Sequence, residues 1–211
     1  MRREIQPEKK ALLVVDLQLD FMPGGALPVP KGDEIVPGIL NLLEQKQFDL
    51  VVATQDWHPR GHRSFASSHA GKKPMDKIEL YGHEQILWPD HCVQGSAGAE
   101  LYPGVPWEYA MLILRKGTDP KVDSYSAFRG NWDEHGNRPP TGLAGFLREC
   151  GVEKIFICGL ARDVCVKWTA EDAQALGFNA VVLWNLTRAV DPSSDETVGN
   201  ELTARGVSII R

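Results

Sequence analysis

Residues 155–177 join a continuous apolar run to a helical pattern, and this junction restricts the fold more than any other part of the chain. The run from Ile155 to Gly159 is typical of a strand that is buried on both faces. The spacing of apolar residues beyond it predicts a helix that ends at Gly177. Cys165 should therefore lie on the first turn of a helix that follows directly from a buried strand.

Cys165 occupies a position in which a cysteine can become a nucleophile. The free N–H groups and the positive dipole end at the start of a helix favour a thiolate over a thiol, and the same amides can hold an oxyanion. The alternative is that Cys165 is a small core residue, which is the commoner case for a single cysteine. The choice depends on which side chains accompany it.

Strand and helix patterns alternate along the whole chain. This alternation predicts an α/β fold with one six-stranded, mostly parallel sheet and helices on both faces, a Rossmann-like arrangement in three layers. We expect a single domain that spans residues 1–211. The predicted strands are 11–16, 50–56, 110–116, 155–159, 180–185 and 207–210, and the predicted helices are 33–46 with Asp33 as its N-cap, 141–150 with Thr141 as its N-cap, a helix up to 177, and 191–205.

Composition excludes several classes of function. The net charge of -5 and the absence of a basic run argue against a nucleic-acid partner. No apolar stretch is long enough to span a bilayer, and the first residues lack the apolar core of a signal peptide, so we expect a cytoplasmic protein without a membrane partner. The 4 cysteines form no C-x-x-C pair, which predicts free thiols.

Three of the predicted strands lead to side chains that can carry acid–base or nucleophilic chemistry. Asp16 ends the first strand, Lys116 ends the third, and Cys165 follows the fourth. Ligands bind at the carboxyl ends of parallel strands, so these three side chains should meet there. A cationic Lys116 would favour the thiolate of Cys165, and Asp16 could move a proton to a leaving amine. The set therefore predicts nucleophilic acyl transfer.

A candidate metal site lies in the long irregular stretch 57–107, which holds five of the six histidines. Asp56 and His58 are two residues apart in extended chain and can converge on one ion, and His91 offers a third ligand. Carboxylate and imidazole ligands suit Zn first, with Fe or Mn as alternatives. The sequence leaves two roles open for His62, that of a fourth ligand and that of a hydrogen-bond donor to the site.

Five motifs, in this order along the chain, resemble the isochorismatase-like cysteine hydrolases and, within them, the nicotinamidase (pyrazinamidase) branch. They are Asp16-Leu-Gln-Leu-Asp-Phe21, Thr54-Gln-Asp-Trp-His-Pro59, Ile86-Leu-Trp-Pro-Asp-His-Cys-Val-Gln94, Arg115-Lys-Gly117 and Gly159-Leu-Ala-Arg-Asp-Val-Cys165. The first, fourth and fifth are typical of the superfamily, and the other two of the nicotinamidase branch.

The resemblance implies a nicotinamidase that releases nicotinate and ammonia through a thioester in NAD salvage, and that also hydrolyses pyrazinamide. It implies catalytic Asp16, Lys116 and Cys165, and one divalent metal ion on Asp56, His58 and His91. It further implies a substrate ring between Phe21 and Trp88, and a cis peptide before Ala161 that turns the Ala161 and Cys165 amides into an oxyanion hole.

Two other functions remain open from the sequence. A different amidase of the same superfamily, acting on an N-carbamoyl compound, would have no use for the metal ligands. A binding module or redox-sensing thiol protein with the same fold would need neither Asp16 nor Lys116, and both are present. The sequence is also compatible with a homo-oligomer.

Overall fold

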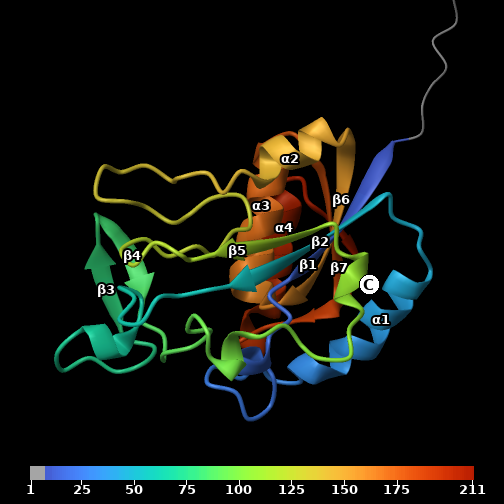
Figure 1. Cartoon of the computed structure of the whole chain (residues 1–211). Helices are drawn as coiled ribbons and strands as arrows, with labels where there is room; N and C mark the ends of the chain where they lie inside the picture. Colours follow the sequence, from blue (N-terminus) through green and yellow to red (C-terminus); the bar gives the residue numbers. More distant parts are fainter. Residues whose placement is uncertain (1–7) are drawn as a thin grey trace, which may run out of the picture.

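The computed structural model describes residues 8–211, and a six-stranded sheet runs through its centre (Figure 1). All five strand pairs in this sheet are parallel, and the strand order is β5-β2-β1-β6-β7-β8. The strands are β1 (Lys9–Val15), β2 (Leu50–Asp56), β5 (Leu112–Lys116), β6 (Val152–Leu160), β7 (Asn179–Arg188) and β8 (Ser208–Ile210). The predicted six-stranded parallel sheet is confirmed.

Helices cover both faces of the sheet because its central strands are apolar on both sides. The helices are α1 (Val36–Glu44), α2 (Leu143–Glu149), α3 (Lys167–Ala175) and α4 (Asp195–Ala204). Leu13 and Val15 of β1 belong to the core cluster under α2, α3 and α4, whereas Leu12 and Val14 belong to the cluster under α1. This division is the alternation that a strand imposes on successive side chains.

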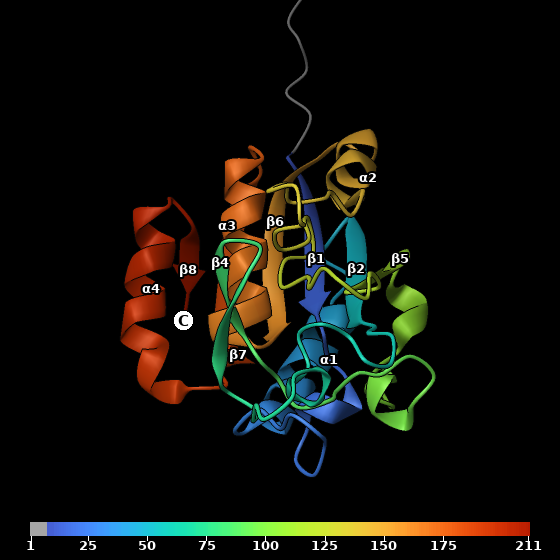
Figure 2. The same cartoon turned by 90° about the vertical axis from the view of Figure 1, so that its left-hand side faces the viewer.

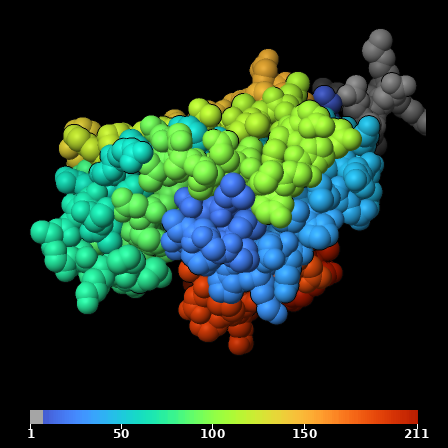
Figure 3. All heavy atoms as spheres, turned by 60° about the horizontal axis from the view of Figure 1, so that its bottom comes forward, coloured from blue at the N-terminus to red at the C-terminus, as the bar shows by residue number. Residues whose placement is uncertain are grey.

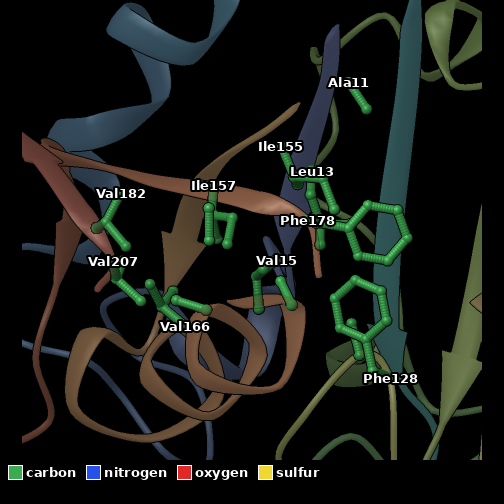
Figure 4. Packing of buried hydrophobic residues seen from close by; sticks show 14 of the residues in the cluster. Ala11, Leu13, Val15, Phe128, Ile155, Ile157, Val166, Phe178, Val182 and Val207 are labelled. Atoms are coloured by element: carbon green, nitrogen blue, oxygen red, sulfur yellow. The ribbon is translucent and has the colours of Figure 1, made fainter. Parts of the chain in front are cut away.

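The larger core cluster packs tightly against the central strands (Figure 4). Ile155 and Ile157 of β6 lie next to Leu13 of β1, and the rings of Phe128 and Phe178 face each other with centroids 5.8 Å apart. All of these side chains are almost fully buried. The two strands that lead to Asp16 and Cys165, β1 and β6, are thus fixed by the centre of the core.

The helix ends differ from the predictions in detail. Asp33 lies inside a short 3₁₀ turn, Gly32–Ile35, that precedes α1, so its prediction as the N-cap was wrong. Thr141 does accept a hydrogen bond from the Leu143 N–H, at 3.2 Å, although Gly142 is the residue next to α2. Gly177 follows α3 with a φ of +90°, as expected for a glycine that ends a helix.

A two-stranded antiparallel hairpin interrupts the stretch that the sequence presents as irregular. Its strands are β3 (Lys77–Leu80) and β4 (His83–Ile86), joined by Tyr81 and Gly82, which both have positive φ. The hairpin lies beyond the carboxyl end of β2, away from the layered part of the molecule (Figures 1 and 2). It was missed because its strands are short and largely polar, so they show little hydrophobic alternation.

Candidate functional site

The candidate site lies where the strand order reverses direction. β1 pairs with β2 on one side and with β6 on the other, so the ends of β1 and β6 form a switch point of the kind at which α/β proteins bind ligands. Asp16 follows β1, and Cys165 follows β6. Gly159 allows the close approach of these strands, because a Cβ there would collide with the Val15 carbonyl.

A small pocket opens at this point and holds about 340 Å³ of space, counted out to the open solvent. Its lining is mostly apolar with a few polar side chains, as is usual for small-molecule sites. Every predicted site residue lines it except Asp16, His58 and Lys116, which are buried beneath. The lining residues are Phe21, Leu27, Asp56, Trp88, His91, Asp123, Tyr125, Ala161, Val164, Cys165 and Val190.

Two loops supply the apolar walls of the pocket. Phe21 lies in a 3₁₀ turn after β1, and its loop packs against the segment around residue 100, as Figure 3 shows from below. Trp88 follows the hairpin, and its Nε1–H donates to the Tyr125 hydroxyl at 3.0 Å. Both aromatic side chains are about 95% buried, which leaves a slot that suits a flat ring.

Lys116 is the centre of the polar floor. Its Nζ lies 2.9 Å from Asp16 Oδ2, 3.1 Å from Asp56 Oδ1 and 3.6 Å from Cys165 Sγ, and it donates to the Ser124 carbonyl at 2.8 Å. Burial would lower the pKa of Lys116, but Asp16 and Asp56 outweigh it and hold that pKa well above its ordinary value. The structure thus brings together the three residues predicted as catalytic, around the Lys116 amine.

Asp16 is held in an uncommon backbone conformation, with a φ of +44°. The Thr54 hydroxyl fixes it by accepting from the Asp16 N–H at 3.0 Å and donating to Asp16 Oδ1 at 2.6 Å. Burial raises the pKa of Asp16, and the Lys116 ammonium only partly opposes this. Strained residues of this kind cluster at functional sites, and a raised carboxyl pKa suits a group that accepts and returns a proton.

Cys165 lies in a π-helical turn, Arg162–Val166, immediately before α3, rather than in the first turn of the α-helix. A cis peptide joins Leu160 to Ala161, as the resemblance implied. Burial raises the pKa of the Cys165 thiol well above its ordinary value, and the lowering effect of Lys116 is smaller. A base that removes the thiol proton is therefore part of what the site must supply.

The three predicted metal ligands converge on one point. Asp56 Oδ2 lies 3.0 Å from His58 Nε2 and 3.4 Å from His91 Nε2. His58 Nδ1 donates to the Gly117 carbonyl at 3.0 Å, and His91 Nδ1 donates to the Pro89 carbonyl at 2.8 Å. In their neutral form both histidines therefore direct an Nε2 lone pair at a carboxylate oxygen, and either a metal ion or an imidazolium proton between these groups satisfies both.

The donor distances also fit a metal ion. With bonds of about 2.0–2.1 Å, two neighbouring ligands on one ion are about 2.9–3.4 Å apart. Asp56 has a further property that the sequence did not indicate, because its Oδ1 contacts Lys116 while its Oδ2 faces the histidines. One carboxylate thus joins the candidate metal centre to the candidate catalytic lysine.

Several site residues were not foreseen. Thr54, Asp123 and Tyr125 were missed, although Asp123 and Tyr125 lie in the loop that directly follows the predicted strand end at Lys116. The other three cysteines are free thiols; Cys150 is half-buried, and Cys92 and Cys158 are buried, which raises the pKa of both. Within residues 8–211, no helix is both long and apolar enough to cross a membrane.

Comparisons with known proteins agree with this geometry. Residues 10–211 match the isochorismatase domain model. A nicotinamidase of Acinetobacter baylyi is 46% identical over 97% of this chain and 94% of its own length. A solved nicotinamidase/pyrazinamidase of Acinetobacter baumannii superimposes with a TM-score of 0.90 at 42% identity, over 98% of this chain and 97% of that one.

A pyrazinamidase of Pyrococcus horikoshii, solved in complex with zinc, has a TM-score of 0.75 at 37% identity, over 96% of this chain and 99% of its own. The family match spans nearly the whole chain, and the curated relative exceeds 40% identity over almost its full length. The chain belongs to the isochorismatase domain family.

Proposed function

We propose that this chain is a nicotinamidase, which hydrolyses the carboxamide of nicotinamide to nicotinate and ammonia. The observation that carries the proposal is the floor of the pocket, where one Lys116 ammonium contacts both Asp16 and Cys165 beneath a slot between Phe21 and Trp88. The relatives named nicotinamidase support the choice of nicotinamide among amides. Pyrazinamide, which has the same carboxamide on a similar ring, should also be hydrolysed.

Acylation begins with a proton transfer. Asp16 takes the proton of the Cys165 thiol, and the adjacent Lys116 ammonium stabilises the thiolate while it forms. The sulfur attacks the carboxamide carbon, and the amides of Ala161 and Cys165 hold the resulting oxyanion. Asp16 then gives its proton to the amine, the C–N bond breaks, and ammonia leaves a thioester on Cys165.

Deacylation uses the same carboxylate. Asp16 removes a proton from a water that attacks the thioester carbon, the C–S bond breaks, and nicotinate departs while Asp16 returns the proton to the sulfur. The raised pKa of Asp16 brings the proton affinity of its carboxylate closer to that of the Cys165 sulfur, which suits the proton transfers of acylation and deacylation. No electron transfer is involved, so NAD has no role as a cofactor.

Asp56, His58 and His91 would hold one divalent cation, which supplies a positive anchor for the polar edge of the substrate ring. We propose Zn, with Fe or Mn as alternatives. The zinc complex of the Pyrococcus horikoshii relative supports this choice. The cytoplasmic location, the single domain and a homo-oligomer remain predictions from the sequence.

Ammonia release tests the proposal. Purified, Zn²⁺-loaded protein should release ammonia from nicotinamide, and benzamide, which lacks only the ring nitrogen, should be poorer by up to about 10⁴-fold in kcat/KM because the polar anchor stays unpaired. Comparable kcat/KM for the two amides would show that the metal does not anchor the substrate ring. No ammonia release from nicotinamide would refute the function itself.

A further inference from the structure

Asp123 is a buried carboxylate that the mechanism above does not use. It is only 4% exposed and lines the pocket beside the candidate metal ligands. Its Oδ1 accepts from the Ser124 N–H at 2.8 Å, and its Oδ2 accepts from Gln85 Nε2 at 3.3 Å. These donors are neutral, and within residues 8–211 no lysine or arginine nitrogen lies within 4.0 Å of the Asp123 carboxylate.

The buried charges around Asp123 do not balance. Asp16, Asp56 and Asp123 are all buried, and the buried Lys116 ammonium contacts the first two at 2.9 and 3.1 Å. A buried carboxylate without a counter-charge is strongly destabilised. The nearest group that could carry charge is His58, with its Nε2 at 4.0 Å from Asp123 Oδ1, but His58 is neutral when it serves as a metal ligand. A divalent cation on Asp56, His58 and His91 supplies the missing charge.

Asp123 lies farther from His58 than Asp56 does. Neighbouring ligands on one ion are about 2.9–3.4 Å apart, and both contacts of Asp56 with the histidines fall in that range. The 4.0 Å between Asp123 and His58 exceeds it. The gap suits a water on the ion that donates a hydrogen bond to the Asp123 carboxylate.

His62 complements Asp123. One ring nitrogen of His62 lies within 4.8 Å of the donor atoms of both His58 and Asp123. The Ser64 N–H, which can only donate, points at His62 Nδ1 at 3.2 Å, and the Ser64 hydroxyl lies 2.7 Å from the same nitrogen; with Nδ1 as acceptor, the proton of the neutral ring is on Nε2. Nε2 has no hydrogen-bond partner among the described residues. His62 thus offers no free lone pair to a metal, but it offers a free donor.

We propose that Asp123 and His62 hold the cation site through water, with Asp123 as acceptor and second negative charge and His62 as donor. The proposal rests on the metal site described under the proposed function. It assigns both side chains as positioning residues rather than ligands. It also predicts that their loss weakens metal binding without changing the number of protein ligands.

Metal affinity is the first test. Metal-free wild type and Asp123→Asn are titrated with Zn²⁺ against a chromophoric chelator, and the variant should bind about 10- to 100-fold more weakly. Asp119→Asn makes the same charge change at an exposed position of the same loop and should bind as wild type does. Equal affinity of Asp123→Asn and wild type overturns the proposal. If the wild-type protein binds no Zn²⁺, the candidate metal site is wrong, and this proposal is wrong with it.

The visible spectrum of Co²⁺-loaded protein separates a water-mediated contact from direct coordination. Asp123→Asn and His62→Phe should keep the wild-type ligand-field bands, whereas His91→Ala, which removes a candidate ligand, should shift them. A shifted spectrum in Asp123→Asn or His62→Phe would make that residue a ligand and overturn the proposal. Because His62→Phe is independent of Asp123, it also tests the donor role if Asp123→Asn does not fold.

Discussion

Replacing Gly117 with alanine should disable the candidate metal site through a single methyl group. Gly117 follows Lys116 at the end of β5, has a φ of +65°, and accepts a hydrogen bond from His58 Nδ1. A Cβ at this position would lie 2.5 Å from His58 Cε1 and 2.7 Å from its Nδ1. Ordinary contact begins at 3.4 Å, so the imidazole must retreat by about 0.9 Å.

A shift of this size exceeds what a metal site tolerates, because ligand distances must stay within about 0.2 Å of their normal values. We therefore expect Gly117→Ala to bind Zn²⁺ more than about 100-fold more weakly, beyond the loss typical of an outer hydrogen-bond partner. The left-handed backbone should cost a further 1–2 kcal/mol, roughly, in the free energy of unfolding. Chelator competition measures the first quantity and urea denaturation the second.

Gly61→Ala is the matched control. Gly61 has a φ of +70°, but a Cβ there meets nothing within 4 Å. It should lose a similar free energy of unfolding and keep wild-type Zn²⁺ affinity. If Gly117→Ala binds Zn²⁺ as tightly as Gly61→Ala does, the placement of His58 by Gly117 is wrong.

Three further predictions concern the candidate catalytic residues. Cys165→Ala should release no ammonia from nicotinamide and keep its Zn²⁺, whereas Cys92→Ala should keep most of the rate; loss of metal in Cys92→Ala would make Cys92 a ligand. Asp16→Asn should lower kcat by several orders of magnitude, as residues that act as a unit do, and a loss below tenfold would exclude Asp16 as the proton carrier. Iodoacetamide should alkylate Cys165 more slowly than a free thiol at pH 7, with a rate that rises only at alkaline pH, because burial raises the thiol pKa. Faster alkylation at pH 7 would show that the resting group is a thiolate.

The sheet and the strand-end residues were predictable because both depend on local pattern. The apolar runs that end at Asp16, Asp56 and Lys116 carry their own strand signal, and parallel strands bring such ends to one edge. The break at Gly159 likewise places Cys165 next to that edge. For these residues, position in the sheet follows from position in the sequence.

The remaining features depend on contacts between distant segments. The burial that raises the pKa of Cys165 depends on the loops that close the pocket, and no local pattern reports it. The double use of Asp56 by Lys116 and the histidines depends on the side-chain rotamer. Asp123 gains its surroundings from the hairpin residue Gln85, which pairs with it across 38 positions of the sequence.

Hydroxylamine partitioning tests the central claim, that nicotinamide is hydrolysed through a thioester on Cys165. An acyl-enzyme can be intercepted by hydroxylamine, whereas direct attack of water on the amide forms no acyl-enzyme to intercept. Zn²⁺-loaded protein is incubated with nicotinamide at increasing hydroxylamine concentration, and both products are quantified by chromatography. We expect nicotinohydroxamate to replace nicotinate as hydroxylamine increases. Nicotinate as the only product at every concentration, with nicotinamide still consumed, would contradict the covalent mechanism.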